Sequence, residues 1–464
     1  MQDSRVPYDK NDAESILRHA SKLTGNTLND LIGKGEVVIG GTNTKGRFGQ
    51  IVEEGYFLIE NNNLPLPDFQ NAGIELKVTP MKKTEKGLVS KERLILGIIN
   101  YFEVPEKHFR VFLDKDSHIL IVFYLWEENT DIRDYKFLKV VDWKPSSDEL
   151  RVIREDWDVI EGYVMRGEAH LLSERHTKYL AACTKGTGHG KDMRTQPFST
   201  SLAKQRALSF KASFMTGLYH NNADIGETLV DDGSNDSATV LQGNWSSEET
   251  FEEHVVRKLN RFVGRTCEEI EHELGIDLSS KSKQYYYMLV LSMFGITKKK
   301  HIKEFVEANI SVKTVRIKTT GRPKESTSFP AFKSEILVTQ SWEDSDFFNQ
   351  IDREFFIPVF QFNTRHPEAE ERKSLTFKGA FFWYIPDDDM DVIRGVWEDT
   401  KQKILEERFD DFVKASDRRI AHVRPHGKDS EDCDTYNGKK FVKRGFWLND
   451  VYMMEVINSH LKDR

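Results

Sequence analysis

Asp68, Glu75 and Lys77 are the residues of this chain whose types and spacing could do chemistry, and they lie in the segment PDFQNAGIELK (Pro67–Lys77). Glu75 and Lys77 are two residues apart, so on a strand their side chains project from one face. Asp68 follows two prolines, where the chain can return it beside Glu75. Two carboxylates and an ammonium at one point can hold a hard divalent cation and an activated water. This combination indicates phosphodiester hydrolysis.

The segment around Glu75 has the pattern of a strand at the border of a core. Apolar residues alternate with Glu75 and Lys77 in AGIELKVT (Ala72–Thr79), so an apolar face lies opposite the charged one. A second, continuously apolar segment, ILIVFYL (Ile119–Leu125), has the composition of a buried strand. The first of these strands is the element that we expect to direct Glu75 and Lys77 to one face.

The composition indicates a protein of two or three domains with a highly polar surface. The chain has 464 residues, of which 38% are hydrophobic and 31% charged. No run approaches the roughly 18 apolar residues of a membrane-spanning helix, and the first residues lack the apolar stretch of a signal peptide. Cys183, Cys267 and Cys433 are far apart and form no CxxC pair. This cysteine usage argues against a zinc site or a disulfide framework and favours a reducing cytoplasm.

The net charge of −8 conceals three basic runs. The segment Lys185–Lys211 contains six Lys or Arg residues and one acidic residue. The segment Lys298–Lys324 contains nine Lys or Arg residues and two acidic residues. Four basic residues and no acid lie between Lys439 and Arg444. Such runs form either solvated faces or phosphate contacts. Their presence in a chain with an acid–lysine triad favours phosphate contacts.

The two halves of the chain repeat one pattern. A segment rich in Asn, Asp, Gly and Ser, residues Asn221–Thr250, separates them. Each half opens with an amphipathic helix that breaks at Gly-x-Thr, where Gly25 or Gly264 can end one helix and Thr27 or Thr266 can cap the next. The later matches are the strands Ala72–Thr79 and Ala308–Val315, the apolar strands Ile119–Leu125 and Phe356–Phe362, and the helical stretches around Asp158–Ile160 and Asp391–Ile393.

This repeat predicts a mixed α/β (α+β) fold with two tandem domains, each a mixed sheet flanked by helices. We place the first domain at residues 1–225, a linker at 226–247 and the second domain at 248–464.

The halves differ where the chemistry would occur. Ser311 stands at the place of Glu75, although Lys313 remains at the place of Lys77. Glu304 falls near the place of Asp68. One carboxylate without an acidic neighbour should hold a metal poorly. We therefore expect the second copy to be catalytically degenerate and retained for binding or structure.

These segments resemble the MutH family of mismatch-repair nucleases, and more closely the two-copy type II restriction endonucleases of that family that cut at GATC. The shared nuclease core is the PD-(D/E)xK fold, whose short motif is weak by itself. The likeness extends to the context of the motif, with KGRFGQIVE (Lys45–Glu53) before it and REDWDVIEGYVMRGEAHLLSERHTKYL (Arg154–Leu180) after it. It covers nearly all of the first half and, more faintly, the second.

Carried over position by position, the resemblance implies that Asp68 and Glu75 bind Mg²⁺, with the carbonyl of Leu76 as a further ligand and Mn²⁺ as a possible substitute. Lys77 corresponds to the catalytic lysine.

The resemblance also implies supporting residues around this triad. Glu53 corresponds to an upstream acid, with Glu54 as an alternative because the spacing to the motif is one residue longer than in the repair enzyme. Lys45 and Lys115 match family lysines near the scissile phosphate.

In the family, bases are read by a late loop and a following Arg–aromatic–Lys segment, which match Tyr179–Lys185 and Arg206–Phe214 here. Ser209 stands where the repair enzyme has a tyrosine associated with sensing adenine methylation, so the response to methylation stays open. The implied DNA-binding residues of the first half are Lys185, Arg206, Ser209 and Lys211.

The second half keeps the reading segments better than the catalytic ones, in VRPHGK (Val423–Lys428) and KRGFWLN (Lys443–Asn449). Its implied DNA-binding residues are Arg424, Lys428 and Trp447. The two-copy enzymes of the family are thought to use such a domain as an effector site for a second DNA.

The resemblance thus implies a type II restriction endonuclease that hydrolyses duplex DNA at GATC with Mg²⁺ and leaves 5′-phosphate ends. It also implies a dimer or DNA-bridged assembly in a bacterial cytoplasm. Two alternatives remain. One is a nicking mismatch-repair endonuclease, which the duplicated half disfavours, and the other is a non-catalytic DNA-binding protein with a vestigial triad.

Overall fold

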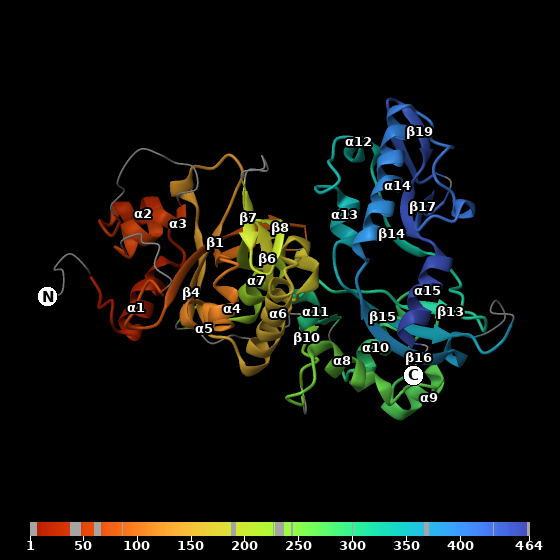
Figure 1. The fold of residues 1–464 in the computed structure, drawn as a ribbon, viewed down its shortest axis with the longest axis horizontal. Coiled ribbons are helices and arrows are strands. Elements are labelled where there is room, and N and C mark those ends of the chain that lie inside the picture. The colour runs from red at the N-terminus through yellow and green to blue at the C-terminus, as the bar shows by residue number, and fades with distance from the viewer. Residues whose placement is uncertain are drawn as a thin grey trace. The chain divides into compact units, whose positions relative to one another are not determined.

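The computed structural model describes residues 7–37, 48–59, 66–85, 87–186, 192–225, 227, 236–242, 245–298, 300–365, 371–429 and 431–461. The chain divides into two compact units, labelled by element in Figure 1. Unit 1 comprises Met1–Ser237 together with Lys303–Asn309, and unit 2 comprises Ala238–Ile302 together with Ile310–Arg464.

Unit 1 is built around a mixed sheet in the order β2-β1-β4-β5. Strands β1 and β4 run parallel, whereas β2 and β5 pair antiparallel at the two edges. The five residues from Ile119 to Phe123 of β4 have no exposed surface, as the apolar run predicts. The strands of this sheet are β1 (Glu75–Thr84), β2 (Gly87–Ser90), β4 (Ile119–Leu125) and β5 (Phe137–Trp143).

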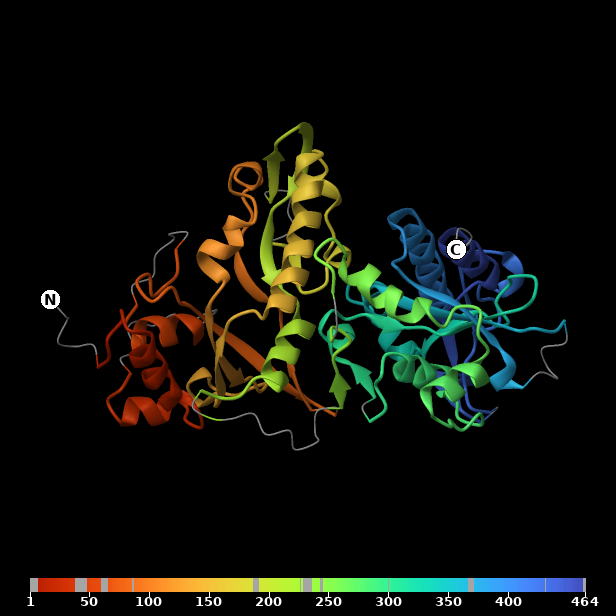
Figure 2. The ribbon, with the colours of Figure 1, turned by 90° about the horizontal axis from the view of Figure 1, so that it is seen from below.

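A second sheet in unit 1 has the order β3-β9-β6, and a hairpin of β7 and β8 extends from it. In Figure 2 this yellow-green hairpin runs beside the long gold helix α6. The strands are β3 (Leu94–Ile98), β6 (Leu180–Thr184), β7 (Met193–Gln196), β8 (Ser199–Lys204) and β9 (Arg206–Phe210). The helices are α1 (Ala13–Ala20), α2 (Leu28–Gly33), α3 (Phe48–Ile51), α4 (Val104–Lys107), α5 (Arg110–Asp116), α6 (Ser147–Met165) and α7 (Ala212–Asn221).

Unit 2 repeats this order of elements. Its main sheet joins β12, β13 and β16 to the central β15, and its second sheet has the order β14-β20-β17. The strands are β10 (Ser237–Ala238, at the boundary between the units), β11 (His301–Ile302), β12 (Ser311–Val312), β13 (Val315–Ile317), β14 (Thr327–Ala331), β15 (Phe355–Gln361), β16 (Thr376–Trp383), β17 (Ala421–Pro425), β18 (Cys433–Tyr436), β19 (Lys439–Val442) and β20 (Arg444–Leu448). The helices are α8 (Phe251–Asn260), α9 (Cys267–Leu274), α10 (Tyr285–Met293), α12 (Ser334–Leu337), α13 (Asp346–Ile351), α14 (Asp387–Leu405) and α15 (Asp450–Leu461).

The predicted Gly-x-Thr breaks are confirmed in both units. Gly25 and Gly264 both adopt positive φ, and each donates its N–H to the strand that follows later in its unit. Thr27 and Thr266 each cap the next helix through a complete capping box. The same local chemistry therefore recurs at the same place of the repeat.

The helix α11 (Lys303–Glu307) departs from the simple division into halves. It lies in the sequence between two elements of unit 2, but it belongs to unit 1, where it packs against α7. Glu304 lies in this helix, so the expectation that it takes the place of Asp68 in the second copy is wrong. The sequence contained no signal that α11 belongs to unit 1, because its position depends on tertiary packing.

In the part of the chain that the structure describes, no helix has both the length and the apolarity required to span a bilayer.

Candidate active site

Glu75 is placed by the parallel pairing of β1 with β4. Its N–H donates to the carbonyl of His118 at 3.0 Å, and its side chain is only 2% exposed. The ammonium of Lys77 lies 2.5 Å from Glu75 Oε1, and that of Lys115 on α5 lies 3.3 Å from the same oxygen. The shared face of Glu75 and Lys77 is therefore confirmed. A third charged group from a separate element joins them.

Asp68 returns to this point through a tight turn. The bridge between Phe69 and Ile74 closes the turn, and Gly73 has a φ of +66° that favours glycine. The N–H of Asp68 donates to Glu75 Oε2 at 3.2 Å, and the N–H of Leu76 donates to Asp68 Oδ2 at 2.9 Å. The N–H of Asp68 thus holds the Glu75 carboxyl, and the N–H of Leu76 holds the Asp68 carboxyl beside it.

Glu53 and Glu54 lie in the helical turn Val52–Tyr56, but only one of them faces the cluster. Burial and the neighbouring carboxyl of Asp68 raise the pKa of Glu53. Glu54 is exposed and accepts a hydrogen bond from the Gln50 amide at 2.7 Å. Of these two glutamates, Glu53 is therefore the one whose carboxyl lies near Asp68 and Glu75.

Asp116 is a member of the cluster that the sequence did not reveal. It is 3% exposed, and its Oδ1 has no hydrogen-bond partner among the described residues. Burial raises its pKa to about 7, against the opposing effect of the Lys77 ammonium. Its only signal in the sequence is its position beside Lys115, just before a strand.

The electrostatics of the cluster reflect crowded carboxyl groups. Burial and the charge of Glu75 raise the pKa of Asp68 to about 6. Burial alone would lower the pKa of Lys77, but the carboxylates of Glu75 and Asp116 raise it. Among the described residues, no group of three or more His, Cys, Asp or Glu side chains is arranged so that it could hold a metal ion.

A cavity of about 850 Å³ opens beside this cluster. Lys115 and Asp116 line it together with residues of β3, α4 and α5, which places open space next to the charged groups. Ile98 and Leu66 line it as well and are 56% and 45% exposed.

The DNA-reading residues expected in unit 1 divide into an exposed and a buried set. Lys185 is exposed at the end of β6, and Lys211 is half-buried with its ammonium donating to the carbonyl of Thr177. Arg206 is 7% exposed and donates to the carbonyl of Ala182, and Ser209 has no exposed surface. The structure therefore buries Arg206 and Ser209, whereas Lys185 is exposed. Lys45 lies outside the described residues.

The start of β6 is anchored by a buried carboxylate on α6. Asp156 is 2% exposed and accepts hydrogen bonds from three consecutive N–H groups, those of Lys178, Tyr179 and Leu180, at 2.6 to 2.8 Å. This anchor fixes the segment that leads to Lys185.

The counterpart of the cluster in unit 2 has the same backbone register. Ser311 pairs with Phe355 as Glu75 pairs with Ile119, and the Ser311 N–H donates to the carbonyl before the partner strand, as in unit 1. Lys313 follows at the place of Lys77, and its ammonium donates to the carbonyl of Ser328 at 3.0 Å.

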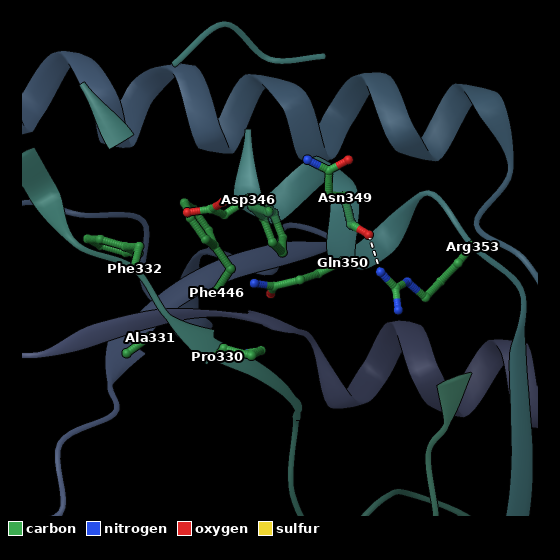
Figure 3. A pocket seen from close by; sticks show the side chains of 9 residues that line it. Pro330, Ala331, Phe332, Asp346, Asn349, Gln350, Arg353 and Phe446 are labelled. Carbon is green, nitrogen blue, oxygen red and sulfur yellow. Dashed lines mark hydrogen bonds between the residues drawn. The ribbon is translucent and has the colours of Figure 1, made fainter. Parts of the chain in front are cut away.

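Arg353 of unit 2 follows α13 and lines a cavity of about 290 Å³, which Figure 3 shows. Its guanidinium donates to the carbonyl of Asn349. Its Nε and the Oε1 of Gln350 are buried without hydrogen-bond partners among the described residues.

The residues expected to bind DNA in unit 2 lie on β17, β20 and the loop between β17 and β18. The guanidinium of Arg424 lies 5.1 Å from the centre of the Trp447 ring, and the ring of His426 lies 5.5 Å from it. Arg424 and Lys428 are exposed. Pairing of β17 with β20 places Trp447 at the register position that Ser209 has in unit 1.

The mixed sheet recurs in both units, but among the described residues the cluster of Asp68, Glu75 and Lys77 at the start of an inner parallel strand is present in unit 1 alone. The family model for the DNA mismatch repair enzyme MutH matches residues 57–156 and again residues 294–395.

One relative is similar to nearly the whole chain, and others are similar to less than half of it. A type II restriction enzyme of Staphylococcus aureus, Sau3AI, is 29% identical over 97% of this chain and 99% of its own length. The MutH proteins of Shewanella woodyi and Actinobacillus pleuropneumoniae are 22% and 24% identical, over 39% and 46% of this chain and 78% and 95% of their own lengths. The chain is thus homologous over nearly its whole length to a type II restriction enzyme, and two of its regions match the MutH model.

Proposed function

We propose that the chain cleaves duplex DNA at GATC by Mg²⁺-dependent hydrolysis in unit 1, leaving 5′-phosphate ends, and that unit 2 binds a second DNA as an effector. The observation that carries this proposal is the meeting of Asp68, Glu75 and Lys77 at one point of unit 1. The full-length similarity to a type II restriction enzyme supports it.

The charge of the cluster fits a divalent cation. Four carboxyl groups and two ammonium groups lie close to one another there, so the fully ionised cluster has two negative charges in excess. One divalent cation balances this excess, and carboxylate and carbonyl oxygens are its preferred ligands. We assign Mg²⁺, with Mn²⁺ as a substitute, to Asp68, Glu75 and the Leu76 carbonyl. The six charged residues are Glu53, Asp68, Glu75, Lys77, Lys115 and Asp116.

The protein residues around this site have separable tasks. The cation, when bound, supplies Lewis-acid stabilisation and an activated water. Lys77 places a positive charge where negative charge develops on the phosphate and orients the attacking water. Lys115 adds a second positive charge from α5, and the carboxyl groups of Glu75 and Asp116 raise the pKa of Lys77.

Unit 2 lacks this charge pattern, so we infer that it binds DNA without cutting it. Ser311 provides no carboxylate at the place of Glu75. The exposed residues Arg424 and Lys428 beside Trp447 supply the DNA-binding face. A dimer or DNA-bridged assembly in the cytoplasm is the form that this two-site arrangement implies.

A plasmid digest tests the proposal. The purified chain with Mg²⁺ should cut unmethylated plasmid into fragments whose ends map to GATC and carry 5′-phosphates. Glu75→Gln should abolish cleavage while DNA binding is retained, and the exposed Glu268→Gln on α9 is the matched control. Fragments unrelated to GATC would remove the specificity claim. Nicked circles as the end product would favour the mismatch-repair alternative, and no cleavage at all would favour a vestigial site.

A further inference from the structure

The place in unit 2 that corresponds to the active cluster of unit 1 is a pocket of the opposite charge. Its cavity measures about 300 Å³ and is bounded by β12, β13, the segment that leads into β14 and the start of α10. Five cationic residues line it, and Glu325 is the one carboxylate among its lining residues. The cationic residues are Lys283, Lys313, Arg316, Lys324 and Arg372.

Glu325, the one carboxylate in the lining of this pocket, forms an ion pair with Arg316. Arg316 donates to Glu325 at 2.9 Å, which neutralises that carboxylate. Arg372 donates to the carbonyl of Ser282, an uncharged partner. Because five cationic residues and one carboxylate line the pocket, its lining carries a net positive charge.

Lys313 is the central donor of this pocket, and its surroundings contrast with those of Lys77. Carboxylates raise the pKa of Lys77, whereas burial, together with the charge of Arg353, lowers the pKa of Lys313 to about 8. Its ammonium lies 4.6 Å from the centre of the Phe329 ring and gives one hydrogen bond to Ser328. An ammonium has three protons to donate, so this lysine can still donate to a ligand.

We infer that this pocket binds one phosphate group of a DNA backbone directly, without a divalent cation. This inference rests on the proposed DNA binding by unit 2 and identifies which group of the DNA the pocket takes. An excess of positive charge repels a cation and attracts an anion. Unit 2 has Ser311 at the register position that Glu75 has in unit 1, and this difference changes the site from one that binds a cation to one that binds a phosphate. The hydroxyls of Thr314, Ser326 and Thr327 line the same pocket and are further donors.

The volume limits what can enter. About 300 Å³ is at the lower end of the range for small-ligand pockets, roughly 300–1,000 Å³. The pocket therefore accommodates one phosphate with part of its sugar, and the rest of the duplex stays outside it. A free phosphate ion has the same chemistry, so the experiment must distinguish the two sources.

Lysine acylation of the full-length wild-type chain, read by peptide mass spectrometry in the presence of a chelator, tests this inference. The chelator removes divalent cations and prevents cleavage. A short GATC duplex at ten times its half-saturating concentration should lower the labelling of Lys313 about tenfold by mass action. Inorganic phosphate at equal phosphate concentration should protect far less. Exposed Lys378 on β16, which does not line the pocket, is the internal control and should be labelled equally throughout.

The pattern of protection separates the inference from the proposed function. Protection of exposed Lys428 without protection of Lys313 would overturn the phosphate pocket and leave DNA binding by unit 2 intact. Protection of neither lysine would overturn both. Protection of Lys313 by free phosphate but not by the duplex would also overturn the inference, because the pocket would then serve a free anion.

A variant gives an independent reading. Lys313→Met keeps the length and apolar stem of the side chain and removes its charge. The duplex concentration that half-protects Lys428 should rise about tenfold or more, since a hydrogen bond to a charged group contributes about 1.5–3 kcal/mol. Lys378→Met is the matched control. An unchanged half-protection concentration in Lys313→Met would contradict the inference.

Discussion

Replacing Glu307 by glutamine should stabilise the protein at neutral and alkaline pH. Glu307 is 1% exposed on α11, where its Oε1 accepts from the Asn221 amide at 2.8 Å and its Oε2 has no hydrogen-bond partner among the described residues. The ammonium of Lys303 lies 3.8 Å from Glu307 Oε1, which is too far for a hydrogen bond. Burial therefore dominates and raises the pKa of Glu307 from 4.5 to about 7.

The sign of the effect follows from proton binding. Between the unfolded value of 4.5 and the folded value of about 7, the folded state binds more protons than the unfolded state, so stability falls as the pH rises through this window. Once the pH exceeds about 7, the ionisation of Glu307 lowers the free energy of unfolding by about 3 kcal/mol. Glutamine keeps the shape and the acceptor but never ionises, so it removes this penalty.

Urea unfolding at two pH values measures the difference. Relative to wild type, Glu307→Gln should gain about 3 kcal/mol at about pH 8 and about 1 kcal/mol or less at about pH 5. Hydrogen exchange of the α11 and α7 amides should slow in parallel at the higher pH. The exposed Glu268→Gln should change stability by less than about 0.5 kcal/mol at both.

Two results would refute the reasoning. A variant that is less stable than wild type at the higher pH would show that the ionised carboxylate makes a favourable interaction, with Lys303 the obvious partner. A gain of equal size at both pH values would show that the effect does not come from ionisation.

Three further predictions concern the site in unit 1. Lys77→Met should slow cleavage by about 10²–10³ while a filter-binding assay in chelator finds unchanged affinity for DNA; an equal loss of binding would give Lys77 a role other than catalysis. Glu53→Gln should slow cleavage by at least tenfold, because its carboxyl faces the cluster, whereas Glu54→Gln should not; the reverse order in a plasmid digest would exchange their roles. Asp156→Ala should cost about 3 kcal/mol in urea unfolding through the loss of three buried hydrogen bonds, and a loss below about 1 kcal/mol would mean that water replaces the carboxylate.

The sequence by itself determined the features that depend on a few neighbouring residues. The two-residue period placed Glu75 and Lys77 on one face, and the Gly-x-Thr pattern located a helix break in each copy. Both follow from backbone geometry and capping, which act within about one turn of chain. The repeated order of these local signals also indicated the duplication and the MutH likeness.

Only the tertiary structure decided which distant groups meet and what each environment does to their charge. Asp116 enters the cluster because α5 ends beside β1, and α11 joins unit 1 although its neighbours in the sequence belong to unit 2. Arg206 and Ser209 resemble surface readers in the sequence, but the sheet buries them. Burial and charge repulsion depend on the summed positions of segments far apart in the chain, so no local pattern encodes them.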